Sequence, residues 1–371
     1  MGPLQGFRII EISGIGPGPF CGMLLADMGA DLIRIERPGG PGAGVAVPDK
    51  FNVLLRGRPA IEVDLKTVDG VELVLRLCEK ADALFEGFRP GVMEDLGLGP
   101  EDCMGVNPKL VYGRITGWGQ EGPLAQAAGH DGNYASIAGA IAAIGEKNGP
   151  PVVPLNLVGD YGGGGAYLAI GLLAALLEAQ RSGAGQVVDA AMVDGAASLM
   201  SLFYGLHAGG LWQDERGSNM LDGGAPFYRP YETKDGNYIF IAAIEPKFYS
   251  ALLEAAGITQ LDPSSQFDRS TWPAQMEVFT STFAGRSREE WAAMFDGSDA
   301  CVAPVLSLSE APDHPHNRAR NSFMQIDGVT QPAPAPRFSR TGSEVRAGSD
   351  GAEIRAILNS WGLGNDADKN I

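Results

Sequence analysis

The sequence predicts an α/β protein with two domains: a large domain with a mainly parallel sheet and flanking helices, and a smaller α+β domain. One observation is a repeated strand–helix–strand pattern over residues 1–190. A second is the change to a hairpin followed by helices over residues 226–305. A third is the length of 371 residues, which is more than one compact domain usually holds.

The first crossover unit begins near the N-terminus. Residues 7–13 (FRIIEIS) are mostly apolar and β-branched and predict a strand, and residues 14–19 predict a turn. Residues 20–28 predict a helix that Gly29 ends, and residues 31–36 predict the next strand. A helix between two strands at this spacing indicates a parallel pair joined by a crossover.

The same alternation continues through the large domain. We expect further strands at 60–65, 83–86, 109–116 and 186–191, and helices at 70–80, 135–143 and 166–179. A last helix at 351–361 is expected to dock on this domain, so that residues 330–371 return to it.

The small domain is expected between two connecting segments. Strands at 228–233 and 238–243 flank the sequence KDGN, which is a hairpin signal, and helical patterns follow at 247–256 and 288–295. Residues 191–225 and 306–329 are assigned as linkers; the first contains a helical pattern from 192 to about 206 and the Gly-rich run 218–226.

The composition disfavours several kinds of partner. Lys and Arg number 28 against 45 Asp and Glu, and the formal net charge of -17 disfavours nucleic acid and anionic membranes. The N-terminus has no signal-peptide hydrophobic region, and the apolar helix expected at 166–179 is shorter than the ~20 residues of a membrane span. We therefore expect a cytoplasmic protein with no nucleic acid or membrane partner.

No metal site or prosthetic group is expected. The four cysteines are scattered without a C-x-x-C pair, and the close histidines His314 and His316 have no cysteine nearby. The turn 14–19 (GIGPGP) is similar to a dinucleotide-binding loop, but Pro19 stands at the third glycine of that fingerprint. A glycine-rich turn between strand and helix is the simpler interpretation.

Two segments carry candidate catalytic side chains. Asp160 precedes a run of four glycines at the start of the apolar helix, where bare backbone permits a ligand to approach closely. A helix N-cap role for Asp160 is the open alternative. His130 belongs to the residue type whose ordinary pKa lies nearest neutral pH, which suits proton transfer. A purely structural role for His130 stays open.

Basic residues gather at the expected strand ends. These are Arg34, Arg37, Arg56, Arg58 and Arg89. Ligands of α/β sheets bind at the carboxyl ends of strands, so positive charge there on an acidic chain indicates a phosphate-rich ligand. Scattered solvated charge is the alternative.

Several segments, taken together and in order, resemble the class III CoA-transferase family and, within it, the α-methylacyl-CoA racemases of bacterial type. They include DLIRIERP (31–38), FRPGVME (88–94), TGWGQEGP (116–123), GHDGNY (129–134), NLVGD (156–160), VVDAAMVDG (187–195) and MLDGGAPFY (220–228). The resemblance covers residue 4 to about 340. It implies two interlocked subunits, hence a homodimer in which the small domain of one subunit covers the large domain of the other.

The resemblance also implies a chemistry. His130 and Asp160 correspond to the bases that remove the α-proton from the S and R epimers of a 2-methylacyl-CoA, through an enolate. Glu245 corresponds to a residue that hydrogen-bonds the histidine across the subunit interface. The alternative is a class III CoA transferase with Asp160 as an acyl-anhydride nucleophile. Those transferases usually carry an aromatic residue at position 130, so His130 favours the racemase.

Coenzyme A is then part of the substrate, and no prosthetic group is needed. The contacts implied for it are Arg37; Val63, Asp64, Leu65 and Lys66; Gly87, Phe88 and Arg89; and Gly129, Asp131, Gly132, Asn133 and Tyr134. Two positions depart from the family pattern. Gly132 replaces an isoleucine, and Asp95 stands where the bacterial racemases have a CoA-contacting arginine.

Overall fold

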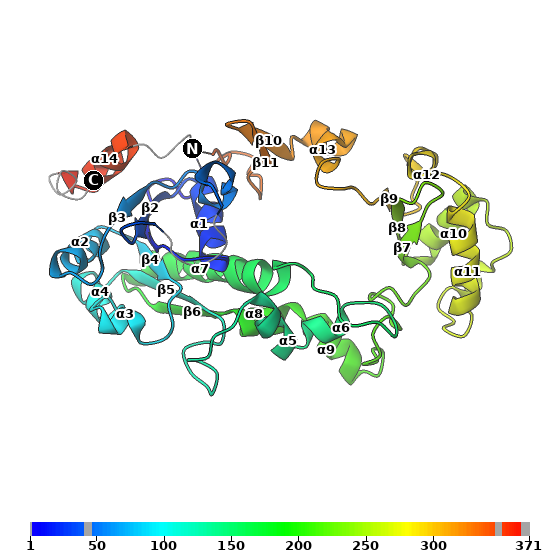
Figure 1. Ribbon diagram of the computed structural model, residues 1–371, viewed down its shortest axis with the longest axis horizontal. Helices are drawn as coiled ribbons and strands as arrows, with labels where there is room; N and C mark the ends of the chain where they lie inside the picture. The colour runs from blue at the N-terminus through cyan, green and yellow to red at the C-terminus, as the bar shows by residue number, and fades with distance from the viewer. Residues whose placement is uncertain (1, 41–46, 346–350, 365–371) are drawn as a thin grey trace. The chain divides into compact units, whose positions relative to one another are not determined.

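The computed structural model describes residues 2–40, 47–345 and 351–364. The chain divides into two compact units, which we call the large and the small unit (Figure 1). Of the described residues, the large unit contains those within 1–140, 155–201 and 321–371, and the small unit contains residues 141–154 and 202–320.

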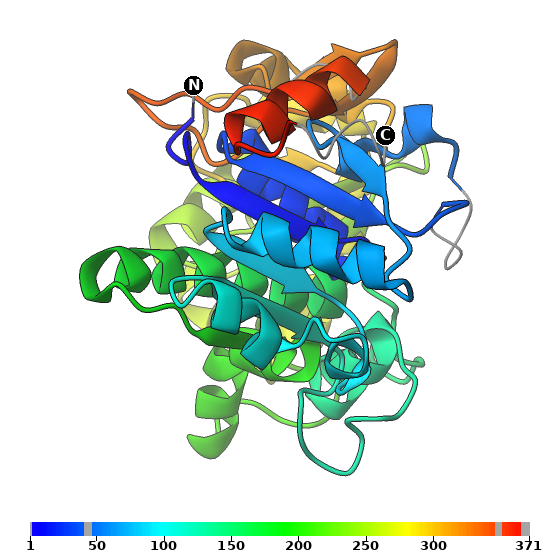
Figure 2. The same cartoon turned by 90° about the vertical axis from the view of Figure 1, so that its left-hand side faces the viewer.

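A six-stranded parallel sheet forms the centre of the large unit (Figure 2). Its order is β3-β2-β1-β4-β5-β6, and the strands are β1 (Arg8–Ile12), β2 (Asp31–Glu36), β3 (Ala60–Glu62), β4 (Ala83–Glu86), β5 (Val111–Thr116) and β6 (Val187–Ala191). The predicted α/β fold with a parallel sheet is therefore confirmed. The strand order reverses between β1 and β4, the point at which open α/β sheets leave a crevice at their carboxyl ends.

Helices cover both faces of this sheet. On one face lie α2 (Val68–Cys78), α4 (Pro100–Val106) and α14 (Gly351–Ser360), and on the other lie α1 (Pro17–Asp27) and α7 (Tyr167–Ser182). Neighbouring strand residues point to opposite faces, so Ile10 packs with the first group and Ile9 with the second. Both faces are buried at the central strands β1, β2, β4 and β5, which explains why these strands are mostly apolar.

The helix expected at 166–179 begins earlier than the sequence predicts. A π-helix, η3 (Leu157–Ala166), runs directly into α7. Its glycines permit backbone contact with α8 (Met192–Leu199): a Cβ at Gly163 would lie 2.5 Å from the amide nitrogen of Ala196. Tertiary contact has thus overridden the low helix propensity of glycine.

The combined helix Leu157–Ser182 has 26 residues, and its most apolar 18-residue stretch has a mean hydropathy of 1.4, so the expectation that this segment is too short to cross a membrane is wrong. However, 44% of its most apolar stretch is buried. Leu168 and Leu172 of α7 pack under the sheet, as in the core helix of a globular unit.

Regular structure also occupies the segments expected as linkers. Residues 191–225 contain α8 and α9 (Ser201–Ala208), and residues 306–329 contain α13 (Pro315–Arg320) and β10 (Phe323–Ile326), which pairs with β11 (Val329–Pro332). Met192 and Ala196 of α8 are buried, so this helix belongs to the large unit rather than to a connection. The remaining short helices near the cavity are α3 (Val92–Asp95), α5 (Asp131–Ile137) and α6 (Ala140–Ala143).

The small unit has its own antiparallel sheet and core. The predicted hairpin is confirmed as β7 (Tyr228–Glu232) and β8 (Tyr238–Ala242), to which β9 (Val302–Pro304) adds a third strand. The helices that cover it are α10 (Pro246–Ala256), α11 (Trp272–Phe283) and α12 (Arg288–Phe295). Buried aromatic rings fill the space between them, for example Phe283 against Trp291 with ring centroids 5.0 Å apart.

Candidate active site

A cavity of about 1560 Å³ lies at the carboxyl ends of the parallel strands, within the large unit. Its wall includes the loop after β1 with the first turn of α1 (residues 13–19), the end of β4 with the loop that follows it (residues 86–90), and residues 116–118 at the end of β5. The first two loops flank the point where the strand order reverses. Residues 14–19, which the sequence marks only as a turn, are therefore part of the cavity wall.

His130 reaches this wall from the residue directly before α5. Its amide nitrogen donates to Oδ1 of Asn133, 3.0 Å away, which fixes the start of the helix. Tyr134 packs edge-on against Trp118 with ring centroids 4.8 Å apart, and a Cβ at Gly129 would lie 2.8 Å from the Tyr134 ring. Close packing of this loop thus holds the exposed imidazole of His130 at the cavity.

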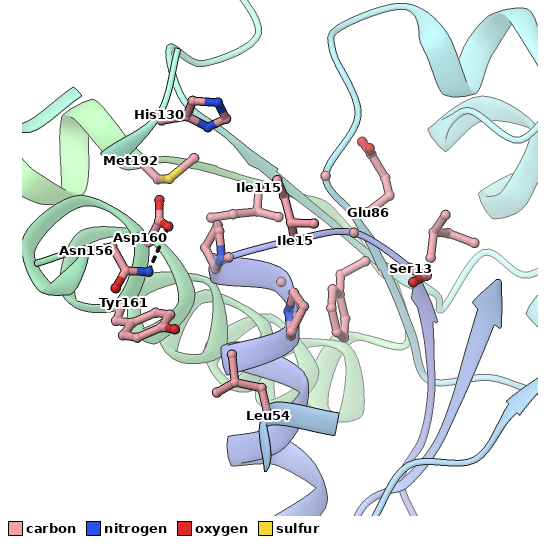
Figure 3. Close-up of a pocket in the computed structure, with 18 of the residues that line it drawn as sticks. Ser13, Ile15, Leu54, Glu86, Ile115, His130, Asn156, Asp160, Tyr161 and Met192 are labelled. Atoms are coloured by element: carbon pink, nitrogen blue, oxygen red, sulfur yellow. Dashed lines mark hydrogen bonds between the residues drawn. The ribbon is translucent and has the colours of Figure 1, made fainter. Parts of the chain in front are cut away.

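Asp160 contributes the second titratable side chain, from the first turn of η3 (Figure 3). The side-chain amide of Asn156 donates to its Oδ2, 3.1 Å away. The residue before η3 is Asn156, so the alternative that Asp160 is a helix N-cap is wrong. A Cβ at Gly16 would lie only 2.9 Å from Asp160 Oδ2, so glycine at 16 lets the start of α1 approach the carboxylate.

The environment of Asp160 favours its protonated form. Burial raises the pKa of Asp160 above its ordinary value, and the negative charge of Asp131 raises it further. The hydrogen bond from Asn156 and the neighbouring His130 act in the opposite direction on this pKa. The carboxyl group is thus moved toward the range in which it can both take and give a proton near neutral pH.

Asp131 directs its carboxylate at the backbone of η3. Its Oδ1 accepts hydrogen bonds from the amide nitrogens of Gly159 and Asp160, both at 2.7 Å. The side chain is 6% exposed, and Asp131 is not among the residues that line the cavity.

Glu86 is a cavity residue that sequence reasoning missed. It ends β4, is 3% exposed and accepts a hydrogen bond from the amide nitrogen of Phe88 at 2.7 Å. The guanidinium of Arg114 lies 3.9 Å from its other oxygen. Burial raises the pKa of Glu86 to about 7. The sequence feature that could have indicated Glu86 is a charged residue at the end of an otherwise apolar strand (ALFE).

The residues expected to contact coenzyme A fall into two groups. Gly87, Phe88, Arg89, Gly129, Asn133 and Tyr134 line the cavity together with His130 and Asp160. In the described structure, Arg37, Val63, Asp64, Leu65, Lys66, Asp131 and Gly132 do not line it. Arg37 is exposed and donates to the carbonyl oxygen of Gly40 at 2.7 Å, whereas Val63 is buried in the core.

The arginines expected at strand ends also fall into those that line the cavity and those that do not. Arg34, Arg56 and Arg89 line the cavity. Arg58 is fully buried and pairs with Glu11, so a direct role for Arg58 in binding a phosphate-rich ligand is wrong.

Glu245 lies in the small unit, at the residue before α10, and is exposed. It does not line the cavity of the large unit.

Comparison with known proteins agrees with this geometry. The profile of CoA-transferase family III matches residues 4–349. The chain is similar to the alpha-methylacyl-CoA racemase of Mus musculus, with 44% identity over 368 residues, covering 98% of this chain and 94% of that protein. It is also similar to the alpha-methylacyl-CoA racemase of Homo sapiens, with 43% identity over 341 residues, covering 91% and 87%.

A solved structure agrees as well. A CAIB/BAIF family protein from Brucella suis superposes with a TM-score of 0.81 and 27% sequence identity, covering 96% of this chain and 99% of that one. The profile match and the identities over nearly the whole length establish that this chain belongs to CoA-transferase family III.

Proposed function

We propose that this chain is an α-methylacyl-CoA racemase, which interconverts (R)- and (S)-2-methylacyl-CoA thioesters. The observation that carries the proposal is that His130 and Asp160 lie on the wall of the same cavity (Figure 3). The mammalian relatives named as racemases support the same reading.

The reaction requires two groups that exchange protons. A proton next to a thioester carbonyl is weakly acidic, and its removal leaves an enolate. His130 takes this proton from the S epimer while Asp160 delivers one to the opposite face, and the roles reverse for the R epimer. A well-placed acid or base contributes roughly 10²–10⁴-fold to such a step.

The enolate oxygen gains negative charge and needs stabilisation. Gly16 approaches the Asp160 carboxylate and immediately precedes α1. A helix N-terminus carries partial positive charge, so α1 is suited to stabilise an oxyanion beside Asp160. Coenzyme A enters as part of the substrate, and the cavity residues 87–89, Gly129, Asn133 and Tyr134 are proposed to contact it. No prosthetic group is part of the proposed reaction.

The same proposal includes a homodimer. The partner subunit's Glu245 is proposed to hydrogen-bond His130 and to fix its ring, which would complete the site in trans. Mixing Glu245→Ala with His130→Ala subunits should then restore activity, because some mixed dimers hold one intact site. Absence of recovery in verified mixed dimers would refute the shared site. A cytoplasmic location without nucleic acid or membrane partners stays a prediction.

The decisive experiment incubates a 2-methylacyl-CoA with the protein in D₂O and follows the α-position by NMR. We expect deuterium incorporation and epimerisation without an acceptor acid. His130→Ala and Asp160→Ala should each reduce racemisation by ~10²-fold or more, whereas His314→Ala, a histidine outside the cavity, should not. Transfer of CoA to free oxalate or succinate without α-exchange would instead establish a transferase with Asp160 as nucleophile.

A further inference from the structure

We propose that Asp131 is a positioning residue that fixes the backbone of Asp160 and adjusts its charge, a role that rests on the proposed function. The contact is direct: one oxygen of Asp131 accepts hydrogen bonds from the amide nitrogens of both Gly159 and Asp160 at 2.7 Å. Amide groups in the first turn of a helix lack partners within the helix. The Asp131 carboxylate therefore supplies acceptors that the π-helix itself cannot.

The packing around this contact leaves no room for a side chain at position 159. A Cβ at Gly159 would lie 2.8 Å from Asp131 Oδ1 and 2.9 Å from the Asp131 carbonyl oxygen. Asp131 itself is buried at the first residue of α5. The dipeptide His130–Asp131 thus presents one base to the cavity and holds the backbone of the other base.

The charge of Asp131 acts on Asp160 as well. The groups that face Asp160 are Asp131, His130, the amide of Asn156 and the hydroxyl of Tyr134, whose own pKa is raised mainly by burial and also by Asp160. Ionisable groups on the other helices packed against η3 act elsewhere. On α8, Asp194 lies near Asp189, whose pKa is raised mainly by burial, and on α7 the hydroxyl of Tyr167 donates to Ser198. On α1, Asp27 pairs with Arg56 and Cys21 lies near Glu11. Removing the negative charge at position 131 should therefore lower the pKa of Asp160.

Two substitutions separate geometry from charge. Asp131→Asn keeps an acceptor oxygen for the two amide groups but removes the charge, whereas Asp131→Ala removes both. A displacement of about 1 Å of a catalytic group can cost 10²-fold in rate. We expect Asp131→Ala to lower kcat by ~10²-fold in both directions with KM for acyl-CoA little changed, because Asp131 does not line the cavity.

The negative charge of Asp131 is expected to affect the pH–rate profile of one epimer and not of the other. When the R epimer is the substrate, Asp160 must be ionised. The rate therefore falls at low pH as Asp160 becomes protonated, and this low-pH limb of the pH–rate profile follows the pKa of Asp160. Asp131→Asn should move that limb to lower pH. With the S epimer His130 is the base, and the low-pH limb should stay in place. Asp69→Asn, which removes an exposed carboxylate in the first turn of α2, is the matched control and should move neither limb.

The experiment measures deuterium exchange and racemisation of both epimers across pH for the wild type and the three variants. A raised KM with unchanged kcat in Asp131→Ala would assign Asp131 to coenzyme A binding and overturn the proposal. An unmoved R-epimer limb in Asp131→Asn would also overturn it. Gly159→Ala, which crowds the same contact, keeps the proposal testable if Asp131→Ala does not fold, and it should likewise lower kcat. A wild type without α-exchange would refute the proposed function itself.

Discussion

Replacing Gly163 with alanine is expected to separate η3 from α8 and thereby to move Asp160. The new Cβ would lie 2.5 Å from the amide nitrogen of Ala196 and 2.8 Å from the carbonyl carbon of Gly195. The shorter contact is roughly 0.9 Å closer than the 3.4 Å at which ordinary contacts begin. Both neighbours are backbone atoms of a packed helix, so no side-chain rotation can relieve the clash.

The size of the effect follows from this geometry. Inserting one methyl group into a packed interior typically costs about 1–3 kcal/mol, and a shift of about 1 Å at a catalytic group can cost 10²-fold in rate. We expect Gly163→Ala to lose stability in this range in urea denaturation and to lower kcat for racemisation by ~10²-fold.

Gly105→Ala is the matched control. This glycine lies in α4, where a Cβ would meet no atom within 4 Å, and alanine is favoured over glycine in helices. The control should leave activity unchanged and stability equal or slightly higher. Wild-type stability and rate in Gly163→Ala would refute the argument that backbone contact between η3 and α8 places Asp160.

Three further outcomes are expected. Burial raises the pKa of Glu86 from 4.5 in the unfolded chain to about 7, so the folded state holds an extra proton between these pH values. The free energy of unfolding relative to Glu86→Gln should therefore fall by on the order of 3 kcal/mol as pH rises from about 4.5 to about 7. A difference between the two proteins that does not change with pH in urea denaturation would contradict this. Arg58→Leu leaves the buried Glu11 carboxylate unpaired and should lower the free energy of unfolding by about 3–5 kcal/mol. Adding Glu11→Leu to the same chain should recover most of this loss. Equal stability of the single and the double variant would contradict the unpaired charge as the cause. Asp95→Arg, at an exposed position of α3, should lower KM for acyl-CoA a few-fold at low salt with kcat unchanged. A KM that does not depend on this charge at low ionic strength would place coenzyme A elsewhere.

The parallel sheet could be predicted because its strands are short apolar runs separated by helical patterns. The predicted strand at 31–36 and helix at 288–295 have the bounds that the structure shows. Their local preferences and their burial agree, so sequence reasoning was sufficient there. The hairpin of the small unit follows from turn chemistry in the same way.

The π-helix could not be predicted. Gly162 to Gly165 have low helix propensity and read as a flexible segment. Their helical conformation depends on α8, more than twenty residues later, whose Gly195 permits the two backbones to meet. Propensity within a short window holds no information about such a contact.

In the candidate site, too, some residues could be predicted from the sequence and others could not. His130 and Asp160 could be predicted by residue type and by resemblance, and both line the cavity. The roles of Asn156 and Glu86 depend on what faces each side chain after folding, which spacing does not reveal. The resemblance assigns Asp131, with the rest of the loop 129–134, to coenzyme A, whereas its carboxylate contacts the backbone of η3.

The docking of α14 has a consequence for the folding of the chain during its synthesis on the ribosome. Ile354, Ile357, Leu358 and Trp361 cover the same sheet face as α2 and α4. β5 precedes α14 by roughly 240 residues, so translation at ~5–20 residues per second leaves the part of this face that α14 covers exposed for roughly 10–50 s. The nascent chain therefore exposes an apolar surface while the entire small unit is still being made, and a chaperone that shields this surface during elongation would favour the yield of folded protein.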